Sequence, residues 1–479
     1  MHFRAFTLGG CQLVMMGHHT RSESLFYYFR LEDHVPEDHL LRLIDKHVDL
    51  GFVRDRLKHH YSDTGRPSID PELLLRILLI GYLYGITSER HLVEEVGMHL
   101  AYRWFTGLEF DQEVPHHSTF SKNRHGRFQE ADIFRELFEA IVARCIEVGL
   151  VRGKHLSVDG TQVSANASNK SRVTREAFSE AAEVNQTVRQ YLEELAAKNP
   201  TPETPAPGSQ EASAKLMAIM PEKLSTTDPD ASWSGKSGPA VWAYYDNYLI
   251  DNESCIVLGV EATQARFSQE PVAAKQMIAT AKARFGLQPE SLGADKGYGS
   301  AEFIDWLWKQ DITPHIPLID RRQQTKGAFT KDDFTYLPTE NAYRCPAGQL
   351  LPYAGLNRPT QQYIYRSTPT QCGSCPLKSK CTSGKVRKLG VSWYEPARER
   401  ARALVDSPAF VDSLCARSKV EALFSELKQR IRLSRLRLRR MRLVTEQFLL
   451  AATVQNLKRM VRFLNNSKPQ PAVVIRGRG

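Results

Sequence analysis

The order of elements from residue 155 onwards limits the fold of this chain more than any other feature of its sequence. A short run of strand-forming residues, 155–160, ends in Asp-Gly. Two more such runs, 241–250 and 255–265, are separated by Asp-Asn-Glu-Ser, which is typical of a hairpin. A helix over 272–285 then leads to a strand over 292–295. Strands that alternate with helices in this way predict an α/β domain.

The elements that follow narrow the prediction. A helix over 301–309 leads to a fifth strand over 315–319, and long helices close the chain over roughly 397–463. This order predicts a ribonuclease-H-like α/β fold, with a mixed five-stranded sheet flanked by helices. The first and fourth strands are neighbours in such a sheet, so Asp159 and Asp295 at their ends should lie side by side. A lone Asp at a strand end more often serves a turn or cap, so their joint position carries the prediction.

The region before this domain, residues 37–148, is predicted to be entirely helical. One helix should begin at Pro71 and end near Gly85, and a second should run over 88–104. Lys122 and Arg124 lie at the entry to a third, basic helix. Such a succession suits a helix-turn-helix DNA reader, and an ordinary three-helix bundle fits the same pattern equally well.

Composition limits the class of protein. The 479 residues carry a net charge of +10, which favours a polyanionic partner such as nucleic acid. No run approaches 18 uninterrupted apolar residues, so no membrane span is predicted. Residues 1–15 lack the cleavage site of a signal peptide, and translation from Met15 or Met16 is the preferred interpretation. The sequence therefore predicts a cytoplasmic protein.

Half of the eight cysteines crowd into one short segment before the last helices. A disulfide-stabilised domain would spread its cysteines more evenly, whereas a cluster with a Cys-x2-Cys knuckle is typical of a structural zinc site. Free or redox-active cysteines are the alternative. The proposed zinc ligands are Cys345, Cys372, Cys375 and Cys381.

Two-metal cleavage of DNA needs carboxylates that converge from separate elements, so a third acid should come from a late helix. Glu421 and Glu426 are the candidates. Arg417, Glu421 and Lys428 are spaced by four and seven residues and share one helical face, whereas Glu426 falls on another. A solvated ion pair between Arg417 and Glu421 would produce the same spacing.

These residues resemble the DDE transposases of bacterial insertion sequences, in the branch marked by Tyr-x2-Arg-x3-Glu-x6-Lys. The spacing Arg417-x3-Glu421-x6-Lys428 matches this signature and selects Glu421, although Leu414 stands at the tyrosine position. The resemblance extends over nearly the whole chain from about residue 22. Its other segments are Leu25–Phe29, His117–Phe120, Val158–Thr161, Ala294–Tyr298 and Asn456–Arg459.

The resemblance implies a catalytic triad of Asp159, Asp295 and Glu421 that binds two Mg2+ or Mn2+ ions. A metal-activated water would cut DNA at the ends of the element, and the freed 3′-OH would then attack target DNA. Arg417 and Lys428 would contact phosphate near the scissile bond. Lys296 and Tyr298 could do the same, although a simple turn role suits them equally well.

The stretch 428–442 contains no acid and is rich in arginine. It directly follows the proposed catalytic helix, so phosphate binding by Arg435, Arg437 and Arg439 is the preferred interpretation over a merely solvated face. The resemblance implies double-stranded DNA as partner, both the terminal inverted repeats of the element and the target. It also implies a homodimer on DNA and an association with the bacterial nucleoid.

The predicted domain boundaries follow from these assignments. The alternative functions are a DNA-binding protein that regulates without cutting, or a copy that has lost its activity. All three carboxylate positions are filled, which argues against both. The predicted parts are an extension 1–21, a helical DNA-binding domain 22–148, a catalytic domain 149–319 with an insertion at about 166–235, a Cys-rich zinc-ribbon-like insertion 320–395, C-terminal catalytic helices 396–465 and a tail 466–479.

Overall fold

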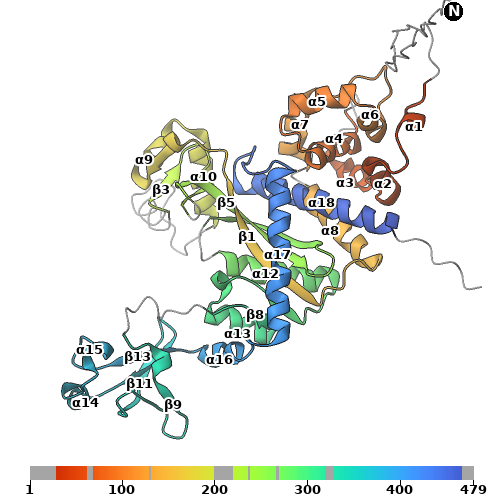
Figure 1. Ribbon diagram of the computed structural model, residues 1–479. Helices are drawn as coiled ribbons and strands as arrows, with labels where there is room; N and C mark the ends of the chain where they lie inside the picture. Colours follow the sequence, from red (N-terminus) through yellow and green to blue (C-terminus); the bar gives the residue numbers. More distant parts are fainter. Residues whose placement is uncertain are drawn as a thin grey trace, which may run out of the picture.

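The computed structural model has three parts, which Figure 1 shows together. Helices from the first third of the chain form one part, a central sheet with its helices forms another, and a small antiparallel sheet projects from the second. The predicted extension 1–21 and the proline-rich stretch 200–209 lie outside the described residues, as does the tail beyond 466. The structure describes residues 29–61, 68–128, 131–198, 220–235, 238–265, 269–318 and 328–466.

The N-terminal part contains helices and no strand among its described residues between 29 and 148, so the prediction of an all-helical region is confirmed. Whether it reads DNA through a helix-turn-helix stays a prediction. Its α-helices are α1 (Leu31–His34), α2 (Leu40–His47), α3 (Phe52–Leu57), α4 (Pro71–Tyr84), α5 (Glu89–Met98), α6 (Leu100–Thr106), α7 (His117–Asn123) and α8 (Ile133–Glu147).

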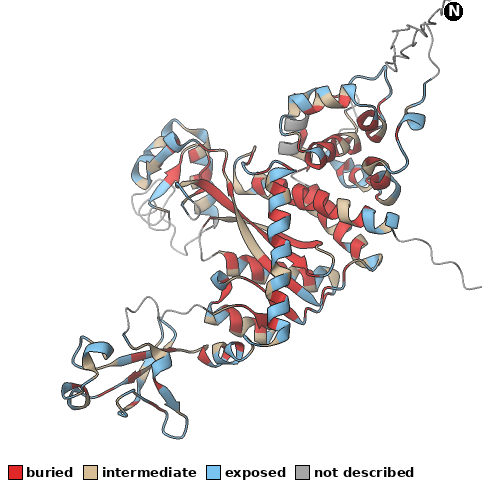
Figure 2. Ribbon diagram, viewed as in Figure 1, coloured by how far each residue is buried: buried red, intermediate tan, exposed pale blue. Residues whose placement is uncertain are grey.

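Helix α4 begins and ends where the sequence predicts. The Asp70 side chain accepts a hydrogen bond from the backbone N–H of Glu72, and Gly85 ends the helix at a φ of 67°. Most of α4 is buried, as Figure 2 shows. No single helix among the described residues is long and apolar enough to span a membrane. Helices α4 and α5 pass that test only together, as a pair bent by 99°.

The prediction of one helix over 88–104 is wrong. Ser88 does cap α5, since its side chain accepts a hydrogen bond from the N–H of His91. However, His99 adopts an extended conformation, with φ −101° and ψ 118°, and separates α5 from α6. The His99 ring stacks on Tyr102 at 4.0 Å between centroids, so a local side-chain contact accompanies the break.

The central sheet has β1 at its middle. Antiparallel β5 lies on one side of β1 and parallel β7 on the other, so the first and fourth predicted strands are neighbours, as expected. Strand β6 pairs with β5, and β8 pairs in parallel with β7, while β4 adds to the start of β5. The strands are β1 (His155–Ser164), β4 (Ser232–Ser234), β5 (Val241–Asp251), β6 (Val257–Gln264), β7 (Ser291–Gly293) and β8 (Thr313–His315).

Helices pack on this sheet and join it to the N-terminal part. Helix α17 packs along β1 and β7, α12 along β5 and β6, and α18 against β6 as well as α2, α4 and α8. As a result, one continuous hydrophobic core extends from the N-terminal helices into the sheet. The helices are α12 (Glu270–Phe285), α13 (Ala301–Lys309), α16 (Glu395–Arg402), α17 (Pro408–Gln429) and α18 (Met441–Asn466).

A close backbone contact marks the junction between the helical part and the sheet. Gly85, in the left-handed region, lies against the turn that follows α17, and a Cβ atom there would overlap the backbone oxygen of Arg430. Gly107 has a similar φ of 70° at the end of α6, but a Cβ there would meet nothing within 4 Å. Substitutions at the two glycines can therefore be compared to separate the energetic cost of a positive φ from the cost of the contact with Arg430.

We expect Gly107→Ala to lower the free energy of unfolding by about 1 kcal/mol, because a side chain is strained at positive φ. Gly85→Ala should cost an additional ~1–3 kcal/mol, since the junction must open to admit the methyl group. Thermal melts and urea titrations of both variants would measure the difference. Equal losses would mean that the contact at Gly85 relaxes without cost.

Within the insertion between β1 and β5, the amphipathic pattern of residues 171–198 predicts a single helix, but the structure differs. The chain first forms β2 (Arg172–Thr174), which pairs with β3 (Lys223–Ser225), and then the two helices α9 (Arg175–Glu180) and α10 (Gln186–Lys198). Thr174 caps α9, and the Asn185 side chain accepts hydrogen bonds from the N–H groups of Thr187 and Val188. These capping residues interrupt the helical period.

The sequence predicts a Cys-rich, turn-rich insertion over 320–395 without regular strands, but its described residues form an antiparallel sheet in the order β13-β12-β11-β10-β9. A small core that includes Phe334, Leu351 and Leu389 holds it together. Its elements are β9 (Thr335–Leu337), β10 (Ala342–Arg344), β11 (Leu350–Asn357), β12 (Gln362–Arg366), β13 (Lys388–Ser392), α14 (Pro369–Gly373) and α15 (Lys378–Cys381).

Candidate active site

Two of the predicted carboxylates belong to adjacent parallel strands, Asp159 within β1 and Asp295 just after β7. Ser157 of β1 pairs with Gly293 of β7, and Asp159 and Asp295 each lie two residues further along. Asp295 lies two residues after the end of β7 and caps the short 3-10 helix Lys296–Tyr298, since its side chain accepts a hydrogen bond of 2.7 Å from the N–H of Gly297. β1 itself continues beyond the predicted end at residue 160, so Asp159 lies within the strand.

The Asp159 carboxylate is in an environment that opposes its negative charge. The pKa of Asp159 is raised to about 6, chiefly by burial and additionally by the nearby carboxylates of Asp295 and Glu270. A hydrogen bond of 2.8 Å from the N–H of Gly160 and the charge of Arg417 act in the opposite direction. Such a carboxylate gains from any additional cation.

Arg417 connects the first and third predicted carboxylates. Its Nη1 donates to Asp159 Oδ2 at 3.0 Å, and its Nη2 donates to Glu421 Oε1, also at 3.0 Å. Both carboxylates therefore lie against one planar guanidinium group. The Glu421 side chain is 60% exposed and that of Asp159 only 15%, so Glu421 forms the outer side of this arrangement.

Glu426 lies on a different side of α17. Its carboxylate pairs with Arg459 at 3.0 Å and with Lys458 at 3.6 Å, both on α18. Gln455 of α18 approaches the same carboxylate at 3.5 Å. These contacts give Glu426 a structural role in joining α17 to α18.

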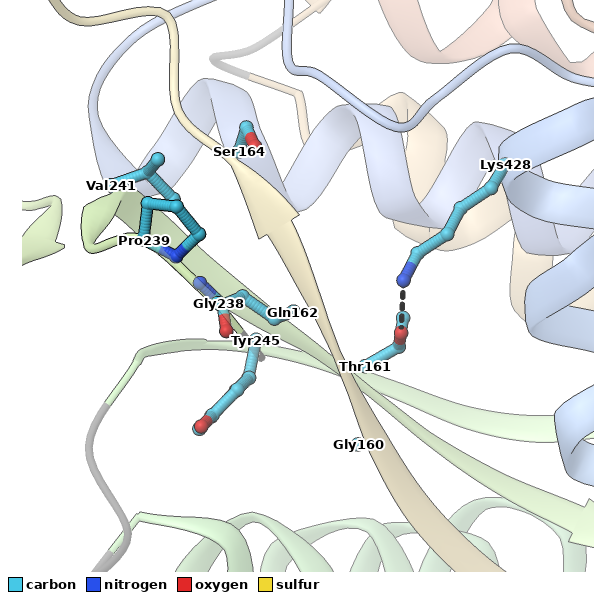
Figure 3. A pocket seen from close by; sticks show the side chains of 9 residues that line it. All are labelled: Gly160, Thr161, Gln162, Ser164, Gly238, Pro239, Val241, Tyr245 and Lys428. Atoms are coloured by element: carbon cyan, nitrogen blue, oxygen red, sulfur yellow. Dashed lines mark hydrogen bonds between the residues drawn. The ribbon is translucent and has the colours of Figure 1, made fainter. Parts of the chain in front are cut away.

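Lys428 lines a pocket together with Gly160, the residue that follows Asp159 in β1. Its Nζ donates to Thr161 Oγ1 at 2.7 Å, as the dashed line in Figure 3 shows. The pocket has a volume of about 310 Å³ and is lined by residues of β1, including Gln162, and by Tyr245 of β5. Burial lowers the pKa of Lys428, while the nearby carboxyl of Asp246 raises it. The Lys428 amino group thus lies at the edge of the site.

Glu270 is a fourth acid at the site that the sequence did not predict. It lies in the first turn of α12 and is only 3% exposed, and it acts on the charge of Asp159. A Cβ atom on Gly160 would lie 3.3 Å from Glu270 Oε1, so the glycine allows the helix to approach the strand. Acids are common at helix N-termini, so the sequence carried no particular signal for this residue.

Burial corrects one of the predicted DNA contacts and limits another. Tyr298 is fully buried, and its ring is tilted against that of Phe303 at 6.2 Å between centroids, because the turn after β7 directs it into the core. The guanidinium of Arg437 lies over the ring of Tyr82 at 4.9 Å, and its Nε and Nη2 are buried without a hydrogen-bond partner in the described structure. The Tyr298 ring is therefore not available to a phosphate, whereas Arg437 as a whole is only half-buried, and its contact with DNA stays a prediction.

The other predicted DNA contacts lie at the surface where their side chains are described. Lys296, Lys122 and Arg435 are exposed. Arg439 is exposed too, although its Nε donates to the backbone oxygen of Asn166 at 2.8 Å. The side chain of Arg124 lies outside what the structure describes.

The four clustered cysteines come together in the small sheet, where they line one cavity of about 20 Å³. The N–H of Gln349 donates to Cys345 Sγ at 3.3 Å, and Ser367 Oγ lies 3.0 Å from Cys372 Sγ. Burial raises the pKa of the Cys381 thiol, and the other three cysteines add to this effect while Arg387 opposes it. Sulfurs distant in sequence are thus gathered at one place.

No group of three or more His, Cys, Asp or Glu side chains in the described part of the chain is arranged, as it stands, to hold a metal ion. At the carboxylates, the guanidinium of Arg417 lies between Asp159 and Glu421. Arg417 would therefore have to move before these two side chains could share one cation.

Comparison with known proteins identifies the chain by its family. The model of a Transposase domain (DUF772) matches residues 29–126, and that of a Transposase DDE domain matches residues 344–461, which include Arg417, Glu421 and Lys428. No curated protein matches the chain. The cryo-EM structure of a piggyBac transposase synaptic complex with hairpin DNA aligns with 90% of this chain and 76% of that chain, at 10% identity. Its TM-score of 0.34 does not establish a shared fold. The two family matches confirm the resemblance of the sequence to the DDE transposases of insertion sequences.

Proposed function

We propose that this transposase binds the terminal inverted repeats of an insertion sequence, cleaves the DNA there and joins the 3′-OH ends to target DNA. The observation that carries the proposal is the gathering of Asp159 and Glu421 around Arg417, with Asp295 beside Asp159. These acids come from β1, the end of β7 and α17. Carboxylates that converge from separate elements are what two-metal phosphodiester chemistry requires.

We also propose that the central sheet is ribonuclease-H-like. With β1, β5, β6, β7 and β8 numbered one to five, the strand order is 3-2-1-4-5. Strands β1, β5 and β6 are antiparallel to one another in turn, and β7 and β8 run parallel to β1. This order supports the assignment and brings Asp159 and Asp295 to adjacent strands.

The carboxylates fit a hard divalent cation such as Mg2+ or Mn2+. Hard cations take oxygen ligands, and the raised pKa of Asp159 beside two further acids indicates a site short of positive charge. Asp159, Asp295 and Glu421 would hold the two ions, which would activate the attacking water or 3′-OH and stabilise the leaving oxygen. Arg417 holds two of these carboxylates when no cation is present, and on its release it becomes available to a phosphate.

Cationic side chains around the acids would position the DNA. Lys428, at the edge of the pocket in Figure 3, and exposed Lys296 flank the candidate triad along β1 and the end of β7. Arg435 and Arg439 follow on the chain and would contact the backbone in any sequence. Lys122 and Arg124 of the helical part would contribute to recognition of the repeats, on which a homodimer would assemble.

The direct test is cleavage of a labelled duplex that carries the inverted repeats flanking the gene. The purified protein should nick or cut at the repeat ends in Mg2+ or Mn2+, and EDTA should stop the reaction. The same duplex with scrambled repeats serves as control. Binding without cleavage in either metal would reject the nuclease and leave a DNA-binding protein.

We further propose that Cys345, Cys372, Cys375 and Cys381 bind one structural zinc. Their four sulfurs line one small cavity, and the N–H group directed at Cys345 Sγ would stabilise a thiolate there. Zinc is commonly held by four thiolates in small domains. The site lies in the projecting sheet and is separate from the candidate active site (Figure 1).

Metal analysis of the purified protein should give close to one zinc per chain. Cys372→Ser with Cys375→Ser should remove it and lower the melting temperature, because a structural metal contributes directly to folding. Cys415, which is exposed on α17, provides the matched control, and Cys415→Ser should keep the zinc. If the wild-type protein contains no zinc, and the double variant melts at the same temperature as the wild type, the cysteines are free.

A further inference from the structure

A second basic surface lies where the helical part meets α17 and α18. It is a cleft of about 840 Å³ lined by Tyr84 at the end of α4, by Arg430 and Arg432 just after α17, and by Arg459 and Arg462 of α18. We call it the arginine cleft. None of these five residues belongs to the candidate active site.

The arginine cleft carries unbalanced positive charge. Its one acid, Glu426, already pairs with Lys458 and Arg459. Arg430, Arg432 and Arg462 are exposed and make no ion pair with any residue that the structure describes. Three arginines that line an open cleft, and that are not paired with an acid, are suited to bind a polyanion.

The positions of two of these arginines are fixed by the backbone. Ile431 and Leu433 are fully buried, whereas Arg430 and Arg432, which alternate with them along the chain, are exposed. Arg432 has a φ of 59°, a strained value for a residue other than glycine, and Gly85 packs directly on the backbone of Arg430. The cationic side chains therefore extend from a rigid turn and not from a loose loop.

The arginine cleft and the candidate active site use different sides of α17. Glu421 and Glu426 are five residues apart, about 140° around a helix axis. Glu421 contacts Arg417 on the active-site side, whereas Glu426 contacts α18 within the cleft. A single stretch of DNA backbone at the scissile phosphate would therefore not account for the cations in the cleft.

We propose that the arginine cleft binds the phosphate backbone of a duplex DNA segment other than the one held at the candidate active site. The proposal rests on the proposed function, since it takes DNA as the macromolecule that the chain binds. Arg430, Arg432 and Arg462 make the contacts, which are independent of base sequence. Helix α17 then lies between two DNA segments.

The test compares two double variants that lose the same charge. Arg430→Gln with Arg462→Gln removes two cations from the cleft. Arg358→Gln with Arg366→Gln removes two exposed arginines of the small sheet, which make no ion pair in the described structure. Affinity for a long duplex carrying the terminal repeat is measured across a range of salt concentrations, with melting curves to verify folding.

The cleft variant should bind the duplex more weakly, and its plot of log Kobs against log[salt] should be less steep by about 1.8, because each phosphate contact contributes about 0.9. The small-sheet variant should match the wild type. Unchanged binding by the cleft variant, or an equal loss in both variants, overturns the proposal. Cleavage is scored separately: a wild-type protein that binds DNA but never cuts it refutes the nuclease, while the salt dependence still decides the cleft.

Discussion

Glu421→Gln is expected to reduce both DNA cleavage and strand transfer by more than about 100-fold while DNA binding survives. Loss of a residue that only supports a metal ligand typically costs about 10–100-fold, and loss of a ligand itself should cost more. The substitution keeps the shape of the side chain and an oxygen that can accept a bond from Arg417. It removes the negative charge that a hard divalent cation requires.

Glu426→Gln is the informative comparison, because it changes the same residue type five positions along the same helix. Its carboxylate pairs with Lys458 and Arg459 and does not approach Arg417. Cleavage at saturating DNA should stay within about threefold of the wild type, with a small loss of stability for a half-buried ion pair. Cleavage of a labelled terminal-repeat duplex in Mg2+ or Mn2+ would measure both variants.

The outcomes separate three possibilities. An inactive Glu426→Gln beside an active Glu421→Gln would reverse the assignment of the third carboxylate. Two active variants would refute the triad itself. Two inactive variants that still bind DNA would mean that the pairing between α17 and α18 is needed to hold Glu421 in position.

Asp159→Asn is expected to abolish cleavage and, at the same time, to stabilise the metal-free protein at neutral pH. The pKa of Asp159 is raised from 3.8 to about 6 in the fold, chiefly by burial. Between about pH 4 and pH 6 the folded protein therefore binds more protons than the unfolded one, so its stability falls as pH rises through this window. At about 1.4 kcal/mol per pKa unit, the ionised carboxylate costs up to roughly 3 kcal/mol above pH 6.

The neutral amide of the Asp159→Asn variant avoids most of this cost. It also loses the charged contact with Arg417, which offsets part of the gain. Urea unfolding without metal should show Asp159→Asn more stable than the wild type at pH 7.5, and the two nearly equal at pH 4. Added Mg2+ should stabilise the wild type and not the variant, because ligand binding to the folded state requires the carboxylate.

Asp251→Asn provides the matched control at the other end of the paired strands. Asp251 accepts hydrogen bonds from the N–H of Gly153 at 3.0 Å and from the N–H and hydroxyl of Ser254 at 2.9 and 2.7 Å. An amide cannot accept all of these bonds, so this variant should lose about 1–3 kcal/mol of stability and keep its activity. A destabilised Asp159→Asn would mean that the bond to Arg417 outweighs the cost of burial.

Local sequence was sufficient wherever the deciding contacts are short-range. Asp70, Pro71 and Gly85 set the two ends of α4, because capping and left-handed backbone depend on residues within one turn. The same holds for the strand that carries Asp159 and for the start of α5 at Ser88. The family motif Arg417-x3-Glu421-x6-Lys428 likewise depends only on spacing along one helix.

Spacing could not decide which side chains the fold would bury. Tyr298 and Arg437 carry groups that suit DNA, yet one enters the core and the other packs on Tyr82 of a distant helix. The break at His99 and the five strands of the Cys-rich segment also escaped prediction. For Arg437 and for the paired strands of the Cys-rich segment the partners come from elsewhere in the chain, so no local pattern records them, whereas a local contact with Tyr102 accompanies the break at His99.

The sequence by itself indicated the resemblance to a family, the order of the main strands of the central sheet, and the three candidate carboxylates, because each depends on consecutive or regularly spaced residues. Only the tertiary structure decided what surrounds them. It brought buried Glu270 beside Asp159, set Arg417 between Asp159 and Glu421, and turned Glu426 towards α18. The physical reason is that charge interactions act through space, and the distances between residues 159, 270 and 421 exist only once the sheet and its helices have packed.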